Sequence, residues 1–214
     1  MRIYLLGIDG SGKSTIAERL KIELEKDGSC DIVWARYKPR IVKLLILPFR
    51  NKKVKSSKDY NSMSAIDYVK WTMTKKEKTK KHPVLAKILF WLQYVEYYFQ
   101  IIGVLSCKYK SHLIVDRYVL DFIVDQSINY GDISESIPVR NLLKKLHAID
   151  KVLFVNVDSE IAFMRKKDIP SLEYLEERRM IYLDYVKKLP NAVCVNNNGD
   201  IEGTMLEIKK MLGL

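Results

Sequence analysis

The sequence has 214 residues, and its formal net charge of +11 with a pI near 9.4 favours anionic ligands, whether nucleotides, nucleic acid or an acidic membrane surface. Its three cysteines lie far apart and form no C-x-x-C pair, so we expect neither a disulfide framework nor a zinc site. This length suits one α/β domain, and because no basic segment with a long apolar core precedes the first motif, we expect no signal peptide and a cytoplasmic protein.

A phosphate-binding loop is predicted near the start of the chain. Residues 7–15, GIDGSGKST, match the pattern G-x-x-x-x-G-K-[ST]. An apolar, strand-like run precedes them at residues 2–8, and residues 14–27 follow with apolar side chains at helical spacing. Glycines let successive backbone N–H groups turn toward one phosphate, and the following helix adds its positive end.

The side chains of this loop have expected roles in binding ATP. Lys13 would reach the β- and γ-phosphates, and the Ser14 hydroxyl would bind Mg²⁺. An ordinary tight turn with a solvated lysine is the alternative. The residues expected to bind the nucleotide are Gly7, Asp9, Gly10, Ser11, Gly12, Lys13, Ser14 and Thr15.

The rest of the chain alternates between strands and helices. Further strands are predicted at residues 31–36, 112–115, 151–157 and 192–196, and helices at 64–73, 83–107, 119–130, 137–146, 159–167, 171–189 and 201–212. This order predicts a parallel sheet whose ligands gather at the carboxyl ends of its strands. Arg36 comes at such an end and is therefore placed to meet an anion.

Residues 38–83 are expected to form a basic insertion. No acidic residue occurs from residue 32 to residue 58, and a second basic run, KKEKTKKH, covers residues 75–82. We interpret both runs as a solvated surface that gathers anionic substrate. Nucleic-acid binding is the alternative, but the runs lack aromatic interleaving and any recognisable nucleic-acid module.

The predicted helix from Pro83 to about Cys107 is apolar on nearly every face, which is typical of a helix in the core. A membrane span is disfavoured because Glu96 lies at its centre. Gln93, Glu96 and Gln100 form one polar stripe. The stripe either lines a wet cleft, where Gln93, Gln100 and the interleaved Tyr97 contact a ligand, or faces solvent.

Asp116-Arg117-Tyr118 ends the third predicted strand. A carboxylate at this strand end, beside the phosphate-binding loop, would hold Mg²⁺ through water. Arg117 would hold a second phosphate. The helix that follows carries Asp121, Asp125 and Gln126.

A basic helical lid is predicted at about residues 165–179. It begins at Arg165-Lys166-Lys167 and includes Arg178 and Arg179 on the next helix. Phosphoryl transfer needs positive charge over the migrating group and exclusion of water, which such a lid supplies. A solvated basic hairpin is the alternative.

Taken in order, these motifs resemble the thymidylate kinase family of nucleoside monophosphate kinases over nearly the whole chain. The resemblance implies a three-layer P-loop kinase fold, with a five-stranded parallel sheet flanked by helices, and one domain over residues 1–214. It also implies transfer of the γ-phosphate of Mg-ATP to a nucleoside monophosphate, dTMP giving dTDP first of all, and a homodimer packed through helices.

The resemblance assigns roles to four residues. Asp9 would touch the acceptor sugar, and Arg36 and Arg117 would hold the acceptor phosphate. One variant of the family carries its transition-state arginine in the phosphate-binding loop, and the other carries it in the lid. Gly10 follows Asp9 in this chain, so the resemblance assigns that role to Arg165.

The acceptor-binding positions depart from the family. Residues 36–40 read RYKPR where the family has Arg-Glu-Pro-Gly-Gly, and no arginine lies near residues 94–95 to read thymine. Asp121 replaces a serine and Asp125 a tyrosine, whereas Gln126 is kept. We therefore expect weak thymine selectivity or another phosphorylated acceptor, with Gln93, Gln100, Asp125 and Gln126 near it. A nucleotide- or nucleic-acid-binding module without turnover is the remaining alternative.

Overall fold

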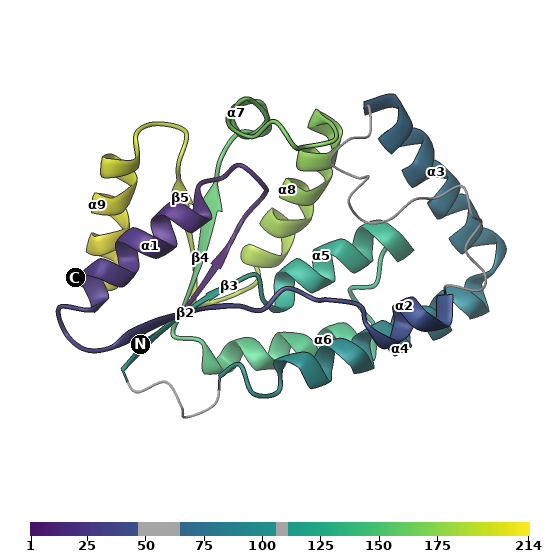
Figure 1. The fold of residues 1–214 in the computed structure, drawn as a ribbon, viewed down its shortest axis with the longest axis horizontal. Helices are drawn as coiled ribbons and strands as arrows, with labels where there is room; N and C mark the ends of the chain where they lie inside the picture. The colour runs from purple at the N-terminus through teal and green to yellow at the C-terminus, as the bar shows by residue number, and fades with distance from the viewer. Residues whose placement is uncertain (47–64, 106–110) are drawn as a thin grey trace.

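The computed structural model describes the chain at residues 1–46, 65–105 and 111–214 (Figure 1). A five-stranded sheet, parallel throughout, crosses this part of the molecule in the order β2-β3-β1-β4-β5. The predicted parallel sheet is therefore confirmed. Its strands are β1 (Arg2–Leu6), β2 (Cys30–Trp34), β3 (His112–Asp116), β4 (Lys151–Asn156) and β5 (Ala192–Asn196).

Helices cover both faces of the sheet and make the expected three layers. Side chains of the central strand β1 alternate between the layers because successive residues of a strand point to opposite faces. Ile3 and Leu5 pack with one layer, and Tyr4 and Leu6 pack with the other. The first layer holds α1 (Lys13–Leu24) and α9 (Ile201–Leu212); the second holds α4 (Pro83–Ile101), α5 (Val119–Tyr130), α6 (Ile137–Lys144) and α8 (Leu172–Val186).

The strand register brings three chain segments to one edge of the sheet. Asp116, the last residue of β3, lies opposite Leu5 of β1 and opposite Trp34 of β2. The loop after β1, the residues after β2 and the residues after β3 therefore leave the sheet side by side. These are the segments that carry the predicted site residues.

Glu96 of α4 fastens the segment that follows β2. Its buried carboxylate accepts hydrogen bonds from the backbone N–H groups of Arg40 (2.6 Å) and Ile41 (2.7 Å), and from the Tyr37 hydroxyl (2.8 Å). These bonds cap α2 (Ile41–Ile46), a short helix that the sequence analysis did not predict. Burial raises the pKa of Glu96, but the backbone and hydroxyl donors outweigh burial and lower it below its ordinary value.

The two glutamines of the same stripe also bind protein groups. Gln100 exchanges two hydrogen bonds with the backbone of Lys38, at 2.7 and 3.1 Å, and Gln93 donates to the Tyr130 hydroxyl at 2.6 Å. Neither earlier interpretation of the stripe, a wet cleft or a solvent face, describes this arrangement. The stripe instead joins α4 to the segment after β2 and to the end of α5.

Helix α3 (Ala65–Lys81) is longer than predicted. We expected a helix near residues 64–73 followed by a solvated basic run, but the helix continues through that run. Lysine and glutamate are good helix formers, which explains the extension. Lys76 pairs with Glu177 of α8 at 2.7 Å, and Thr79 donates to the Asn129 carbonyl of α5. The other basic residues of the expected insertion, within 47–64, lie outside the described residues.

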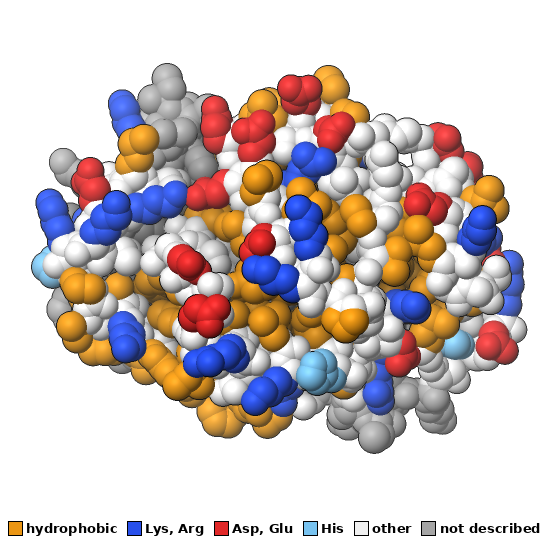
Figure 2. Space-filling view, turned by 180° about the vertical axis from the view of Figure 1, so that it is seen from behind, with side chains coloured by type: hydrophobic (Ala, Val, Ile, Leu, Met, Phe, Trp, Pro, Cys, Tyr) orange, Lys and Arg blue, Asp and Glu red, His pale blue; other side chains and the backbone are white. Residues whose placement is uncertain are grey.

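Helix α4 packs into the core on one side only, which corrects the prediction that it is buried all round. It ends at Ile101, and one side of it is exposed along its whole length. Figure 2 shows hydrophobic side chains gathering at the lower left of that view, on the side where Figure 1 places α4. Apolar residues occur on nearly every side of α4. This pattern alone does not show whether other parts of the chain cover all of these sides or leave one of them exposed. Among the described helices, none combines the length and hydropathy that crossing a membrane needs.

We expect Glu96→Gln to lower the free energy of unfolding by about 1–3 kcal/mol at pH 7, because an amide cannot accept every hydrogen bond that the carboxylate accepts. Since the native pKa of Glu96 is lowered, this contribution exists above the unfolded-state pKa of about 4.3 and is lost as the pH falls below it. Urea unfolding at several pH values tests this. Glu77→Gln, on exposed α3, is the control, and equal losses in both variants would contradict the prediction.

Candidate active site

The loop between β1 and α1 has a backbone shape that requires glycine. φ is 81° at Gly10 and 87° at Gly12, in a region that other residues rarely adopt. A Cβ on Gly12 would lie 2.6 Å from Nδ2 of Asn197, and a Cβ on Gly10 would collide with the Ala162 carbonyl. Because α1 starts at Lys13, its free N–H groups open into the loop, and Ser14 and Thr15 lie exposed in its first turn.

Lys13 folds back onto the loop. Its Nζ donates to the Ile8 carbonyl at 2.6 Å and to the Ser11 hydroxyl at 3.1 Å, and the side chain is buried. Burial, followed by the positive charge of Arg117, lowers the pKa of Lys13 to about 7. The amine is thus surrounded by groups that a bound phosphate could replace or supplement.

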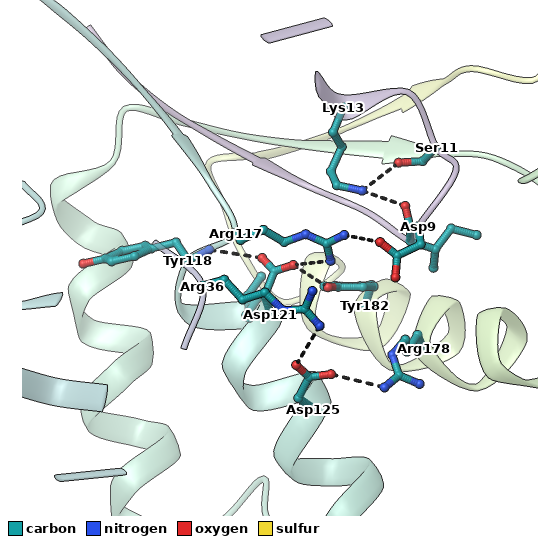
Figure 3. A network of polar contacts seen from close by, with 12 residues as sticks. Asp9, Ser11, Lys13, Arg36, Arg117, Tyr118, Asp121, Asp125, Arg178 and Tyr182 are labelled. Atoms are coloured by element: carbon teal, nitrogen blue, oxygen red, sulfur yellow. Dashed lines mark hydrogen bonds and ion pairs between the residues drawn. The ribbon is translucent and has the colours of Figure 1, made fainter. Parts of the chain in front are cut away.

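Arg117 lies at the centre of a buried charge cluster (Figure 3). Its guanidinium bonds to Asp9 of the loop and, at 3.0 Å, to Asp121 of α5. Burial alone would lower the pKa of Arg117, but Asp121 and then Asp9 raise it well above its ordinary value. Among the described residues, Arg117 is the one non-glycine with positive φ, at 62°. This unfavourable backbone conformation can persist because Asp9 and Asp121 hold the Arg117 side chain in place.

Asp121 fixes the position of Arg117. Its carboxylate accepts hydrogen bonds from the hydroxyls of Tyr4 and Tyr182, both at 2.7 Å, and from the backbone N–H of Tyr118 at 3.1 Å. Asp121 was expected on the helix after the third strand, as a departure from the family, and no role in holding Arg117 was predicted for it. Its place four residues after Arg117, in the first turn of α5, was the available signal, whereas nothing in the sequence identified the two tyrosines.

Asp9 is held from three sides. Besides Arg117, it accepts a hydrogen bond from the Tyr174 hydroxyl at 3.1 Å and lies 3.8 Å from Nζ of Lys166. Burial would raise the pKa of Asp9, but the charges of Arg117, Lys13 and neighbouring cations hold it well below its ordinary value. The carboxylate is therefore ionised and suited to accept hydrogen bonds.

Asp125 forms a second group of contacts one turn further along α5. Nη2 of Arg178, from α8, lies 3.2 Å from one oxygen of its carboxylate, and Nη2 of Arg36 lies 3.9 Å from the other. The guanidinium of Arg178 also lies over the ring of Tyr174, 3.6 Å from its centroid. The fold thus brings together Asp9, Arg36, Arg117 and Asp125, four of the predicted site residues.

Asp116 and Ser14 are compatible with a magnesium site. Oδ1 of Asp116 is buried and has no hydrogen-bond partner among the described residues, and burial raises the pKa of this carboxyl. No cluster of three or more His, Cys, Asp or Glu that could hold a metal occurs in the described ranges. A metal here would therefore need phosphate oxygens and water as its remaining ligands, as Mg²⁺ in nucleotide sites does.

The hydrogen bonds of Arg165 go to the turn after β5. At the end of α7 (Ser159–Arg165), its guanidinium donates to the carbonyls of Asn197, Asn198 and Gly199 at 2.8, 3.3 and 3.3 Å. Lys166, which the sequence analysis assigned no separate role, is the cation of this segment that approaches Asp9. Arg165 therefore lies on the side of the loop where the turn after β5 runs, and its catalytic role stays a prediction.

Three residues expected near the acceptor have other surroundings. Tyr97 is fully buried and stacks on Phe122, with ring centroids 4.3 Å apart. Gln93 and Gln100 bind the groups described above, and the ligand-binding roles expected for these three residues stay predictions. Gln126 is buried on α5, and its Oε1 has no partner among the described residues.

No family model and no curated protein sequence matches the chain. Solved structures do match it. A thymidylate kinase from Candida albicans, whose structure is described as revealing the origin of broad substrate specificity, aligns with a TM-score of 0.59 and 16% identity over 99% of this chain and 90% of its own. A thymidylate kinase from Ehrlichia chaffeensis aligns with a TM-score of 0.54 and 17% identity over 99% and 98%. At these identities the likeness establishes the fold, and the predicted P-loop kinase fold is confirmed.

We expect Asp121→Asn to lower the free energy of unfolding by about 3–5 kcal/mol, because it removes one partner of a buried ion pair and leaves Arg117 short of a counter-charge. Asp184→Asn on α8, which breaks the exposed pair of Asp184 with Lys188, should cost less than about 1 kcal/mol. Urea unfolding of both variants measures the difference. A loss in Asp121→Asn no larger than that of the control would show that Arg117 does not depend on this carboxylate.

Proposed function

We propose that the protein is a kinase that transfers the γ-phosphate of Mg-ATP to a nucleoside monophosphate, with dTMP as the first candidate acceptor. The observation that carries this proposal is the meeting of two anion-binding arrangements at one edge of the sheet. The glycine loop with Lys13 suits a triphosphate, and Arg36 and Arg117 follow the ends of β2 and β3 at the same edge of the sheet. The fold shared with two thymidylate kinases supports the same assignment.

On the donor side, the backbone N–H groups of the loop and the first turn of α1 would bind the phosphates of ATP. Lys13 would exchange its bond to the Ile8 carbonyl for the β- and γ-phosphate oxygens. Mg²⁺, held by Ser14 and through water by Asp116, would supply further neutralisation of phosphate charge. Asn197, which donates to the Ser11 carbonyl at 2.7 Å, would keep the loop in shape.

On the acceptor side, Arg117 would orient the acceptor phosphate, since Asp9 and Asp121 fix its guanidinium before any ligand binds. The acceptor phosphate oxygen is itself the nucleophile, so no strong base is required. Cations of the α7–α8 segment, Arg165 or Lys166, would stabilise the phosphoryl group during transfer. Asp9 would accept a hydrogen bond from the acceptor sugar.

The identity of the acceptor is the less constrained part of the proposal. The described part of α4 offers no arginine to a thymine edge, and the polar groups of Gln93 and Gln100 already bind protein. Without a charged hydrogen bond to the base, the preference for one nucleoside monophosphate over another should fall by about ten- to a hundredfold. We therefore propose weak selectivity among monophosphates. The fold permits this, since one enzyme that shares it is described by its broad substrate specificity.

We expect ADP release that depends on an added monophosphate, in a coupled assay over dTMP, dUMP, UMP, CMP, dGMP and AMP. Lys13→Ala should abolish transfer because it removes the charge at the γ-phosphate. Lys21→Ala, at a partly exposed residue of the same helix, should leave the rate unchanged. If the Lys13→Ala variant stays folded and transfers phosphate at the wild-type rate, the kinase assignment is wrong. Binding of DNA or RNA with a steep salt dependence and no turnover would favour the module without catalysis.

We also propose that two copies associate through the outer face of α4. Six apolar side chains along this face are exposed by 38 to 68%: Leu85, Ile88, Leu92, Val95, Phe99 and Ile102. They recur at alternating spacings of three and four residues, the repeat by which two helices pack along a seam. The face carries the same repeat in every copy, so two copies related by a two-fold axis could cover each other's seam.

We expect a dimer in sedimentation or light-scattering measurements at micromolar concentration. Leu92→Glu and Val95→Glu together should give a monomer, because each places a charge inside the apolar seam. Ile22→Glu changes an exposed residue of α1 and should leave the dimer intact. A wild-type protein that is monomeric at these concentrations would contradict this proposal without affecting the kinase assignment.

A further inference from the structure

We infer that Asp125 is a built-in counter-anion for the acceptor phosphate, and that the acceptor displaces it from Arg36 and Arg178. This inference rests on the proposed function and deepens it, since it adds Arg178 to the acceptor-binding residues. It also makes Asp125 a residue that sets how tightly a phosphorylated acceptor binds. Asp125 lies between the guanidinium groups of Arg36 and Arg178 (Figure 3).

The first step is the geometry of the two arginines. Arg36 leaves the sheet after β2 and Arg178 comes from α8, yet both reach the carboxylate of Asp125 on α5. Each arginine approaches a different oxygen, at 3.9 and 3.2 Å. Two guanidinium groups on either side of one small anion are the arrangement in which phosphate is commonly bound.

The second step is the balance of charge. Arg117 is already neutralised by Asp9 and Asp121, which hold it in place. Arg36, Arg117 and Arg178 carry three positive charges, and Asp9, Asp121 and Asp125 carry three negative charges, so these six side chains together carry no excess positive charge to attract a phosphate dianion. An acceptor phosphate that enters beside Arg36 must therefore either face Asp125 or replace it.

The third step identifies Asp125 as the carboxylate that can leave. The side chain of Asp121 is 3% exposed and binds two tyrosines as well as Arg117, whereas that of Asp125 is 34% exposed. The contact from Asp125 to Arg36, at 3.9 Å, is also a long one. Release of Asp125 would cost little, and release of Asp121 would leave Arg117 buried without its main partner.

The fourth step concerns Arg178, which stays in position when Asp125 leaves. Its guanidinium lies over the ring of Tyr174 and donates to the Tyr174 carbonyl at 3.4 Å. The Tyr174 hydroxyl in turn bonds to Asp9 of the phosphate-binding loop. Acceptor phosphate held by Arg178 would thus be tied through one tyrosine to the loop that holds the donor, which fixes the two substrates relative to each other.

The test is the affinity for dTMP and for inorganic phosphate, measured by calorimetry at low, constant salt and without ATP. Asp125→Asn, which keeps the shape and removes the charge, should bind dTMP about tenfold more tightly. Arg178→Gln should bind it about tenfold more weakly. Asp184→Asn on α8 is the matched control and should leave both affinities unchanged.

A second ligand separates this role from a structural one. Thymidine has no phosphate, so its affinity should not change in Asp125→Asn, whereas a general change in the site would alter both ligands. Weaker or unchanged dTMP binding in Asp125→Asn would overturn the inference. If Asp125→Asn fails to fold, Asp125→Ser removes the same charge and decides the same question.

The inference and the proposed function fail in different ways. If wild-type protein binds none of the monophosphates, the proposed acceptor class is wrong, and inorganic phosphate then serves as the probe. Tighter phosphate binding in Asp125→Asn would still support the displacement of Asp125. Equal phosphate binding in wild type and variant, including none in either, would overturn it.

Discussion

The candidate site depends on the ion pairs that hold Arg117. A buried guanidinium is costly unless its donors meet acceptors, and here one carboxylate comes from the loop after β1 and the other from α5. Tyr4 of the central strand and Tyr182 of α8 then bind the second carboxylate. Arg117 and Asp121 together therefore link the phosphate-binding loop, the central strand, α5 and α8. These bonds hold the four elements in place around the candidate site.

The parts of this architecture that were predictable from sequence are those encoded by neighbouring residues. Five short apolar runs became five parallel strands, and the glycines at positions 10 and 12 take the positive φ that the loop motif requires. Arg36 and Arg117 follow the ends of adjacent strands, so strand order alone brought them near the loop. Local pattern and sheet topology were sufficient for this much of the site.

Contacts between residues that lie far apart in the sequence were not predictable. Glu96 caps α2 from a helix more than fifty residues further along the chain, and Arg165 turned out to bind carbonyls after β5 rather than the loop. The exposure of one side of α4 was missed for a related reason. The spacing of apolar residues shows that one face of a helix is apolar. Whether that face is buried depends on where the other helices and strands of the chain pack.

The surroundings of Lys13 have a consequence for how the site exchanges protons with the solvent. Because burial lowers the pKa of Lys13 to about 7, its amine can gain or lose a proton within the neutral pH range. Phosphate oxygens beside Nζ would raise that pKa again, so a nucleotide that binds above pH 7 takes up a proton from solution. Affinity then falls as the pH rises, and the occupancy of the site is linked to acidity through a residue usually regarded as a permanent charge.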